Sequence, residues 1–93
     1  MQGFTNLYNV KTIILSFNEI EEIEGLENCE QLTKLDLHNN LIHRIKNLEG
    51  KDKLVNLDLT YNWITDWFSI EHVKSHLPNL KEFGMRCNPI ASK

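Results

Sequence analysis

The sequence has few of the residues that hold a small domain together by covalent or metal chemistry. Its 93 residues include only two cysteines, Cys29 and Cys87, which are too few and too far apart for a disulfide framework or a paired-cysteine metal site. The longest apolar run is Ile13–Leu15, so no segment could cross a bilayer. The first residues lack the charged and apolar regions of a signal peptide. We therefore expect an intracellular location: cytoplasmic, with nuclear, ciliary or cytoskeletal sites as alternatives.

The sequence also has no large excess of positive or negative residues, since its net charge is −3. This weak charge gives no electrostatic reason to bind phosphate backbones or anionic membranes directly. No glycine-rich phosphate loop, GxSxG or HExxH motif occurs, so we expect no cofactor and no enzymatic activity. At 41% hydrophobic and 25% charged residues, the composition is that of one ordinary globular domain.

A nine-residue pattern does recur, and each copy closes on an asparagine. It reads apolar-x-x-apolar-x-apolar-x-x-Asn, with isoleucine two residues later, and its copies are spaced by 22, 22 and 26 residues. Each apolar-x-apolar triplet predicts a short strand with two inward side chains and one outward side chain. The asparagines are expected to form a ladder that satisfies backbone groups where the chain leaves each strand. They are Asn18, Asn40, Asn62 and Asn88.

Further apolar residues follow at three-residue steps, as in Ile23-x-x-Leu26-x-x-Cys29. These steps suit a tight 3₁₀-like or extended return to the next strand. The unit resembles the 22-residue leucine-rich repeats of the subfamily typified by the protein phosphatase 1 regulatory subunit. Relatives in this subfamily include a dynein light chain, the spliceosomal A′ protein and ciliary or centrosomal proteins. The resemblance covers residues 4 to 90. It implies an α/β solenoid, a right-handed parallel-strand horseshoe with 3₁₀ or short helical returns on its convex side, whose members mostly act as protein-binding scaffolds.

The boundaries of the repeats follow from the spacing of the four asparagines. We expect one domain over residues 1–93, with repeats at 10–31, 32–53 and 54–79. Residues 1–9 are read as the tail of a preceding repeat, and residues 80–93 as the last strand with a partial C-terminal cap. Terminal repeats normally need a polar cap. Because Phe4, Leu7 and Val10 have no upstream neighbour, we expect either a segment of a longer protein or self-association through the N-terminal end.

Two positions depart from the pattern. The third return is four residues longer than the others and carries Ile70, Val73 and Leu77 at helical spacing, which predicts a short helix near Ser69–Ser75. Ser69 is the expected N-cap, with Asp66 as its rival, and Trp67 aligns with core positions. Lys51 occupies the slot that Cys29 fills in the previous repeat. We expect its return to be distorted, or its ammonium to reach outward along a buried stem.

Outward strand positions in a horseshoe form its concave face, and we expect this face to bind a partner. Apolar residues are not required there for packing, so Ile14, Phe17 and Tyr61 stand out as candidate anchors, although the last column could instead tuck inward. Leu41 and Trp63 follow an asparagine and should lie on the rim, where Trp63 either contacts a partner or packs with Trp67 and Phe68. The predicted concave binding residues are Phe17, Lys34, Asp36, His38, Asn56, Asp58, Tyr61 and Arg86.

Asp36, Asp58 and His38 fall near one another on this face. Two carboxylates and an imidazole on an open sheet lack a third firm ligand and a pocket that excludes water, so we expect neither a metal site nor catalysis there. The leading hypothesis is a protein-recognition module that takes a helix or loop of its partner. The alternatives are a structural spacer within a longer repeat array, or a component of an RNA–protein assembly through protein contacts, without direct nucleic-acid binding.

Overall fold

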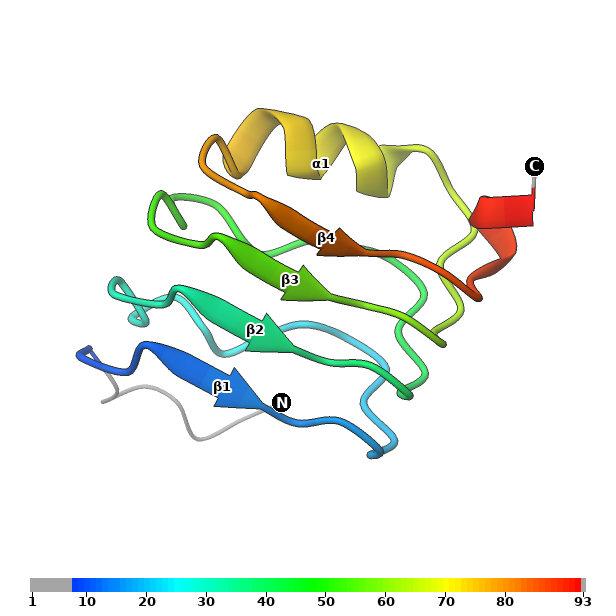
Figure 1. Cartoon of the computed structure of the whole chain (residues 1–93), viewed down its shortest axis with the longest axis horizontal. Coiled ribbons are helices and arrows are strands. Elements are labelled where there is room, and N and C mark those ends of the chain that lie inside the picture. The colour runs from blue at the N-terminus through cyan, green and yellow to red at the C-terminus, as the bar shows by residue number, and fades with distance from the viewer. Residues whose placement is uncertain (1–7, 93) are drawn as a thin grey trace.

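The computed structural model describes residues 8–92, which form a single parallel sheet with its returns stacked behind it (Figure 1). The strands are β1 (Thr12–Ile14), β2 (Lys34–Asp36), β3 (Asn56–Asp58) and β4 (Glu82–Gly84), paired in the order β1-β2-β3-β4. One α-helix, α1 (Phe68–His76), precedes β4, and a 3₁₀ turn, η1 (Pro89–Ser92), follows it. Within the described residues, no helix is long and apolar enough to cross a bilayer.

Equivalent residues of successive repeats pair directly in the sheet. Ile13 pairs with Leu35, Leu35 with Leu57, and Leu57 with Phe83. Each strand begins one residue before the predicted apolar triplet, but the ladder continues past the strand's end, since the amide of Leu15 donates to Asp36 at 2.9 Å. The one-residue offset is therefore a matter of where the strand is taken to end.

The asparagines form a ladder that joins each repeat to the one before it. The side-chain nitrogen of Asn62 donates to the carbonyls of Leu59 and Leu37, at 3.1 and 2.9 Å, and its oxygen accepts from the amide of Ile42 at 3.0 Å. Asn40 and Asn88 make equivalent bonds to their preceding repeats. Buried backbone groups at the turn thus find partners in the side chains above them.

The core is a column of aliphatic side chains between the sheet and the returns. Leu35, Leu37, Leu57 and Leu59 are fully buried on the strand side, and Ile23, Leu26, Ile42, Ile45, Leu48 and Ile64 are as completely buried on the return side. The first two returns are extended and contain turns in which an amide donates three residues back, as Cys29 does to Leu26 at 3.0 Å. They match the expected 3₁₀-like or extended form.

The third return is helical, and it changes which residues face the core. Trp67 is 62% exposed, so the prediction that it is a core residue was wrong. Ser69 is fully buried in its stead, and its hydroxyl accepts a hydrogen bond from the amide of Ile45 at 2.8 Å. Ser69 and Val73 are the buried residues of α1, and Leu77 directly after the helix continues their four-residue spacing, whereas buried residues of the extended returns recur every three. The first buried residue of the helix lies five residues after Ile64, which displaced the alignment by two positions.

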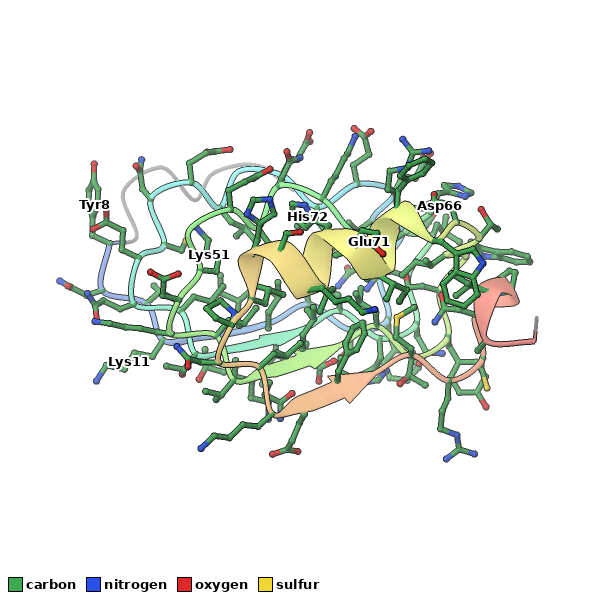
Figure 2. All side chains as sticks on the ribbon, turned by 90° about the horizontal axis from the view of Figure 1, so that it is seen from above. Tyr8, Lys11, Lys51, Asp66, Glu71 and His72 are labelled. Carbon is green, nitrogen blue, oxygen red and sulfur yellow. The ribbon has the colours of Figure 1, made fainter. Side chains whose placement is uncertain are left out.

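The helix bonds to the return below it through side chains. The Ser69 hydroxyl and His72 Nε2 accept from the backbone amides of Ile45 and Leu48, at 2.8 and 3.1 Å. Figure 2 shows His72 on α1. The imidazole therefore has a structural role, which needs its Nε2 lone pair free of a proton.

The start of α1 differs from the expectation by a few residues. The helix begins at Phe68 with Trp67 as its N-cap residue, which makes no side-chain capping bond, so the predictions of Ser69 or Asp66 at the N-cap were wrong. Ser69 is inside the helix. The Asp66 carboxylate accepts from the amide and hydroxyl of Ser69, at 3.0 and 3.3 Å, so Asp66 rather than Ser69 supplies the side-chain bond at this end. Partial burial acts to raise the pKa of Asp66, but the bonds from Arg44 and Ser69 outweigh it and hold that pKa below its usual value. An anion at this end also favours the helix dipole.

Lys51 does not distort its return. Its backbone makes the same pair of turn hydrogen bonds as Cys29, at distances between 3.0 and 3.3 Å, and the residue is only 4% exposed. Within residues 8–92 no fully buried side-chain nitrogen or oxygen lacks a partner, so the ammonium is not sealed in the core. The lysine stem fills the apolar slot, and the return keeps its shape. Residues 1–7 of the predicted tail of a preceding repeat, which include Phe4 and Leu7, lie outside the described residues.

Candidate functional site

The same unusual backbone turn occurs at the end of every strand. Phe17, Asn39, Tyr61 and Cys87 all adopt left-handed conformations, with φ between 57° and 60°. This conformation is sterically strained for any residue other than glycine. Because it recurs in all four turns, the surrounding structure must constrain the backbone there. The asparagine that follows each of them is that constraint, because its ladder bonds fix the path of the chain.

The turn residues remain hydrogen-bonded from repeat to repeat. The amide of Phe17 donates to the carbonyl of His38 at 3.1 Å, and the amide of Tyr61 donates to the carbonyl of Arg86 at 3.0 Å. Asn39 bonds to Thr60 in the same way at 2.9 Å. The sheet spacing therefore persists along this row, and the row forms a rigid edge with its side chains at fixed intervals.

Aromatic side chains on this edge are open to solvent. Phe17 is 73% exposed and Tyr61 is 57% exposed, so the alternative in which this column tucks inward is wrong. Both line a groove of about 680 Å³ that follows the asparagine ladder. Its other lining residues are Asn18, Asn39, Asn40, Asn62, Trp63, Cys87, Asn88 and Pro89. None of them carries a formal charge.

The two rim residues differ in exposure. Trp63 is 54% exposed and lines the groove, whereas Leu41 is 37% exposed. Trp67 and Phe68 are also more than half exposed, so Trp63 is not buried in an aromatic cluster with them. Sequence reasoning missed these two residues as surface candidates. The helical spacing of the third return could have revealed them. If Ser69 faces the core of a helix, the residues one and two positions before it, Phe68 and Trp67, point away from the core.

Polar candidates lie on neighbouring strands of the concave face. Lys34 pairs with Asn56, and Asp36 with Asp58, in the sheet register. Each aspartate accepts a hydrogen bond from the amide two residues on, at 3.2 Å for Asp36 and 3.0 Å for Asp58. These local bonds hold both carboxylates in place. Arg86 is exposed two residues after Gly84.

Gly84 opens a gap beside Asp58. A Cβ atom built on Gly84 would lie 2.6 Å from Asp58 Oδ1 and 2.9 Å from Thr60 Oγ1, which is closer than packed atoms tolerate. Residues of β3 and β4 line a shallow hollow of about 320 Å³ here: Asn56, Asp58, Thr60, Glu82, Phe83 and Gly84. Glycine therefore lets the Asp58 side chain extend across the last strand.

His38 links the acidic column to the aromatic edge. Its ring meets Phe17 edge to face at a centroid distance of 4.9 Å, and its Nε2 lies 3.7 Å from Asp36 Oδ1. Its Nδ1 lies 2.7 Å from Asn39 Oδ1. The structure thus brings Phe17, Asp36 and His38 together. On the other side, a hydrogen bond with Cys87 raises the pKa of the Tyr61 hydroxyl.

One group elsewhere has the residue types of a metal site. Glu49, His72 and His76 offer ligand atoms within 4.8 Å of one another. The amide of Leu48 already occupies the Nε2 lone pair of His72, and a neutral imidazole has only one such pair. A metal ion bound through either nitrogen of His72 would therefore leave that amide without its partner.

Comparison with known families accounts for this architecture. Residues 8–50 match the family described as "Leucine Rich repeats (2 copies)". The chain carries leucine-rich repeats. The matched residues hold β1 and β2, and β3 and β4 continue the repeats in the same register with the same asparagine ladder. The fold is thus a leucine-rich-repeat solenoid, as expected. A search of curated proteins finds no match to the chain.

Proposed function

We propose that this leucine-rich-repeat chain is a protein-recognition module that binds its partner through the concave face and the adjoining aromatic groove. Leucine-rich repeats generally mediate protein–protein interaction, and stacked repeats present extended concave surfaces suited to it. The observation that carries the proposal is the pair Phe17 and Tyr61, which stay exposed on a rigid hydrogen-bonded edge. Exposed aromatic anchors with polar neighbours are typical of binding hot spots.

Polar residues beside the groove supply the specificity. Asp36 and Asp58 occupy the middle of the face, and Lys34 and Arg86 flank them, so a partner must match charges of both signs. The face is an open sheet, which leaves a reacting group exposed to water and favours binding over catalysis. The 22-residue spacing further supports membership of the subfamily typified by the protein phosphatase 1 regulatory subunit.

Affinity capture with matched variants tests this proposal. Tyr61→Ala and Asp58→Arg should each reduce recovery of bound partners about tenfold, as expected for a hot-spot residue. Tyr8→Ala and Glu71→Arg are the controls, because the first makes the same change as Tyr61→Ala and the second also replaces a carboxylate by arginine, both at exposed residues elsewhere. Figure 2 shows Tyr8 at one end of the molecule and Glu71 on α1. Equal recovery with all four variants, each verified as folded by circular dichroism, would remove this face from consideration.

A spacer role within a longer array is the second candidate, and it rests on the outer strands. Phe83 of β4 is 36% exposed, although its partner Leu57 is fully buried. A neighbouring repeat would cover it. Sedimentation of the chain tests the related self-association: a monomer at high micromolar concentration would speak against stacking between copies through these strands.

A further inference from the structure

The two exposed rings on the groove lie two repeats apart. Phe17 belongs to the turn after β1 and Tyr61 to the turn after β3, with Asn39 between them. Hydrogen-bonded strands lie about 4.8 Å apart, so two steps separate the rings' backbone positions by about 9.6 Å. The unbroken amide-to-carbonyl bonds along Phe17, Asn39 and Tyr61 hold this interval in place.

This interval discriminates among the backbone conformations of a bound segment. A polyproline II helix advances 3.1 Å per residue with three residues per turn, so its equivalent side chains recur about every 9.3 Å. A β-strand presents equivalent side chains about every 6.7 Å, and an α-helix turns every 5.4 Å. Of these three conformations, only polyproline II places one side chain opposite each ring, at positions i and i+3, and none opposite Asn39 between them.

The chemistry of the lining agrees with the interval. All lining residues are uncharged, whereas Asp36, Asp58 and Arg86 lie just outside the groove, so the complementary occupant is uncharged along this stretch. The backbone of polyproline II makes no internal hydrogen bonds, and its carbonyls need donors. The Trp63 indole and the Asn39 amide, both in the lining, carry N–H groups that can serve.

From these observations we infer that the groove binds a proline-rich segment of the partner in the polyproline II conformation. Prolines at positions i and i+3 pack on Phe17 and Tyr61. The inference rests on the proposed recognition function and specifies which kind of segment it recognises. The groove crosses three strand steps, from Phe17 to Cys87, or about 14 Å, which accommodates about five residues of such a segment.

Binding of a blocked decaproline peptide tests the inference. Trp67→Phe leaves Trp63 as the single tryptophan, so its fluorescence reports on the groove alone. We expect saturable binding of decaproline and none of an alanine–glutamine helical peptide or a valine–threonine peptide of equal length. Phe17→Ala and Tyr61→Ala should each weaken binding about tenfold. Tyr8→Ala, at an exposed residue outside both the groove and the concave face, should change it less than twofold.

An exchange of two residues tests the spacing itself. The double variant Asn39→Tyr/Tyr61→Asn keeps the composition but places the rings one strand step apart, about 4.8 Å. The left-handed turn accepts both residue types, since Asn39 and Tyr61 already adopt it. We expect a loss as large as that of Tyr61→Ala. Unchanged affinity would overturn the spacing argument.

Modification of Cys87 provides an independent measurement. Cys87 is exposed and lines the groove, whereas Cys29 is buried, so a maleimide should react at Cys87 and block the peptide. Preferential binding of the helical peptide, or decaproline binding that survives both the block and Tyr61→Ala, would overturn the inference. If decaproline fails while Tyr61→Ala and Asp58→Arg still abolish partner capture, the inference fails and the proposed function stands.

Discussion

The two inner strands and the two outer strands each carry one large apolar residue at the same inward position but bury it to different extents. The equivalent core positions Leu35 and Leu57 are fully buried, whereas Ile13 is 6% exposed and Phe83 is 36% exposed. Chemistry does not explain the difference, because all four side chains are large and apolar. The number of neighbouring repeats does: within residues 8–92, β2 and β3 have a strand on each side, whereas β1 and β4 have one on a single side.

The asparagines show that this dependence has a direction. Asn88, in the last repeat, is 2% exposed and bonds back to Leu59 and Ile64. Asn18, in the first repeat, is exposed, and its hydrogen bonds run to Leu15 and Ser16 of its own turn. Each asparagine thus completes the repeat before it. An asparagine therefore makes its ladder bonds when another repeat precedes its own, whether or not a further repeat follows.

The largest expected effect comes from truncating an inner core residue. Leu57→Ala should lower the free energy of unfolding by about 3 kcal/mol, because it leaves a cavity between two covered repeats. Phe83→Ala removes more atoms but should cost only about 1 kcal/mol, since this residue already faces solvent on one side. Urea unfolding followed by circular dichroism measures both. Equal losses would show that the number of neighbours does not govern stability.

Removal of one asparagine side chain from the ladder should cause the next largest loss of stability. Asn62→Ala leaves the buried amide of Ile42 without a partner and removes one of the two side-chain donors to the carbonyl of Leu37, the other being Asn40. We expect a cost of about 2 kcal/mol. Asn18→Ala should cost less than about 0.5 kcal/mol, because its site is exposed. The same unfolding measurement decides. A costly Asn18→Ala would contradict the directional ladder.

Replacement of the buried lysine should stabilise the chain. Burial raises the pKa of the Cys29 thiol, and the Lys51 ammonium acts against this, so the charge lies close to the core column. Lys51→Leu fills the same slot without a charge and should raise the free energy of unfolding by about 1 kcal/mol. Cys29→Leu serves as the control for added volume at the equivalent position. A loss of stability with Lys51→Leu would show that the ammonium makes a contact the return needs.

The smallest expected effect is a pH dependence of the helical return. Burial and the nearby His76 lower the pKa of His72, with Glu49 opposing them. The unfolded chain therefore binds this proton first, at a pKa near 6.5, and the stability falls as the pH drops below that value toward the lower folded pKa. The amide of Leu48 should lose its protection from hydrogen exchange over the same range. His72→Gln should flatten that part of the profile, and an unchanged profile would contradict the role given to His72.

The regular repeats were predictable from the sequence because their packing follows a fixed period. The four asparagines and the apolar triplets specified strand order, register and core, apart from a one-residue offset in the strands. Trp67 was misplaced because the third return enters a helix at Phe68, so the next buried residue after Ile64 is Ser69, five residues on, and not Trp67, three residues on. Lys51 follows the second of its two predicted alternatives, because its long aliphatic stem occupies an apolar slot while its ammonium stays out of the core.

The candidate site was harder to predict, because exposure at a turn depends on backbone conformation. The sequence places Phe17 and Tyr61 in one column but does not reveal the left-handed turn that leaves both rings in solvent. Nor does it show that Asn39, Cys87 and Pro89 join them around one groove. The repeat alignment places Gly84 next to Asp58 in one column, but it does not show how closely the Asp58 side chain approaches the Gly84 backbone.

Side-chain amide exchange, followed by nuclear magnetic resonance, tests the stacked asparagine ladder most directly. We predict slow exchange of the amide protons of Asn40, Asn62 and Asn88, which bond across repeats, and fast exchange for Asn18. Fast exchange at all four asparagines would contradict the ladder, and with it the rigid edge that holds the two aromatic rings in place.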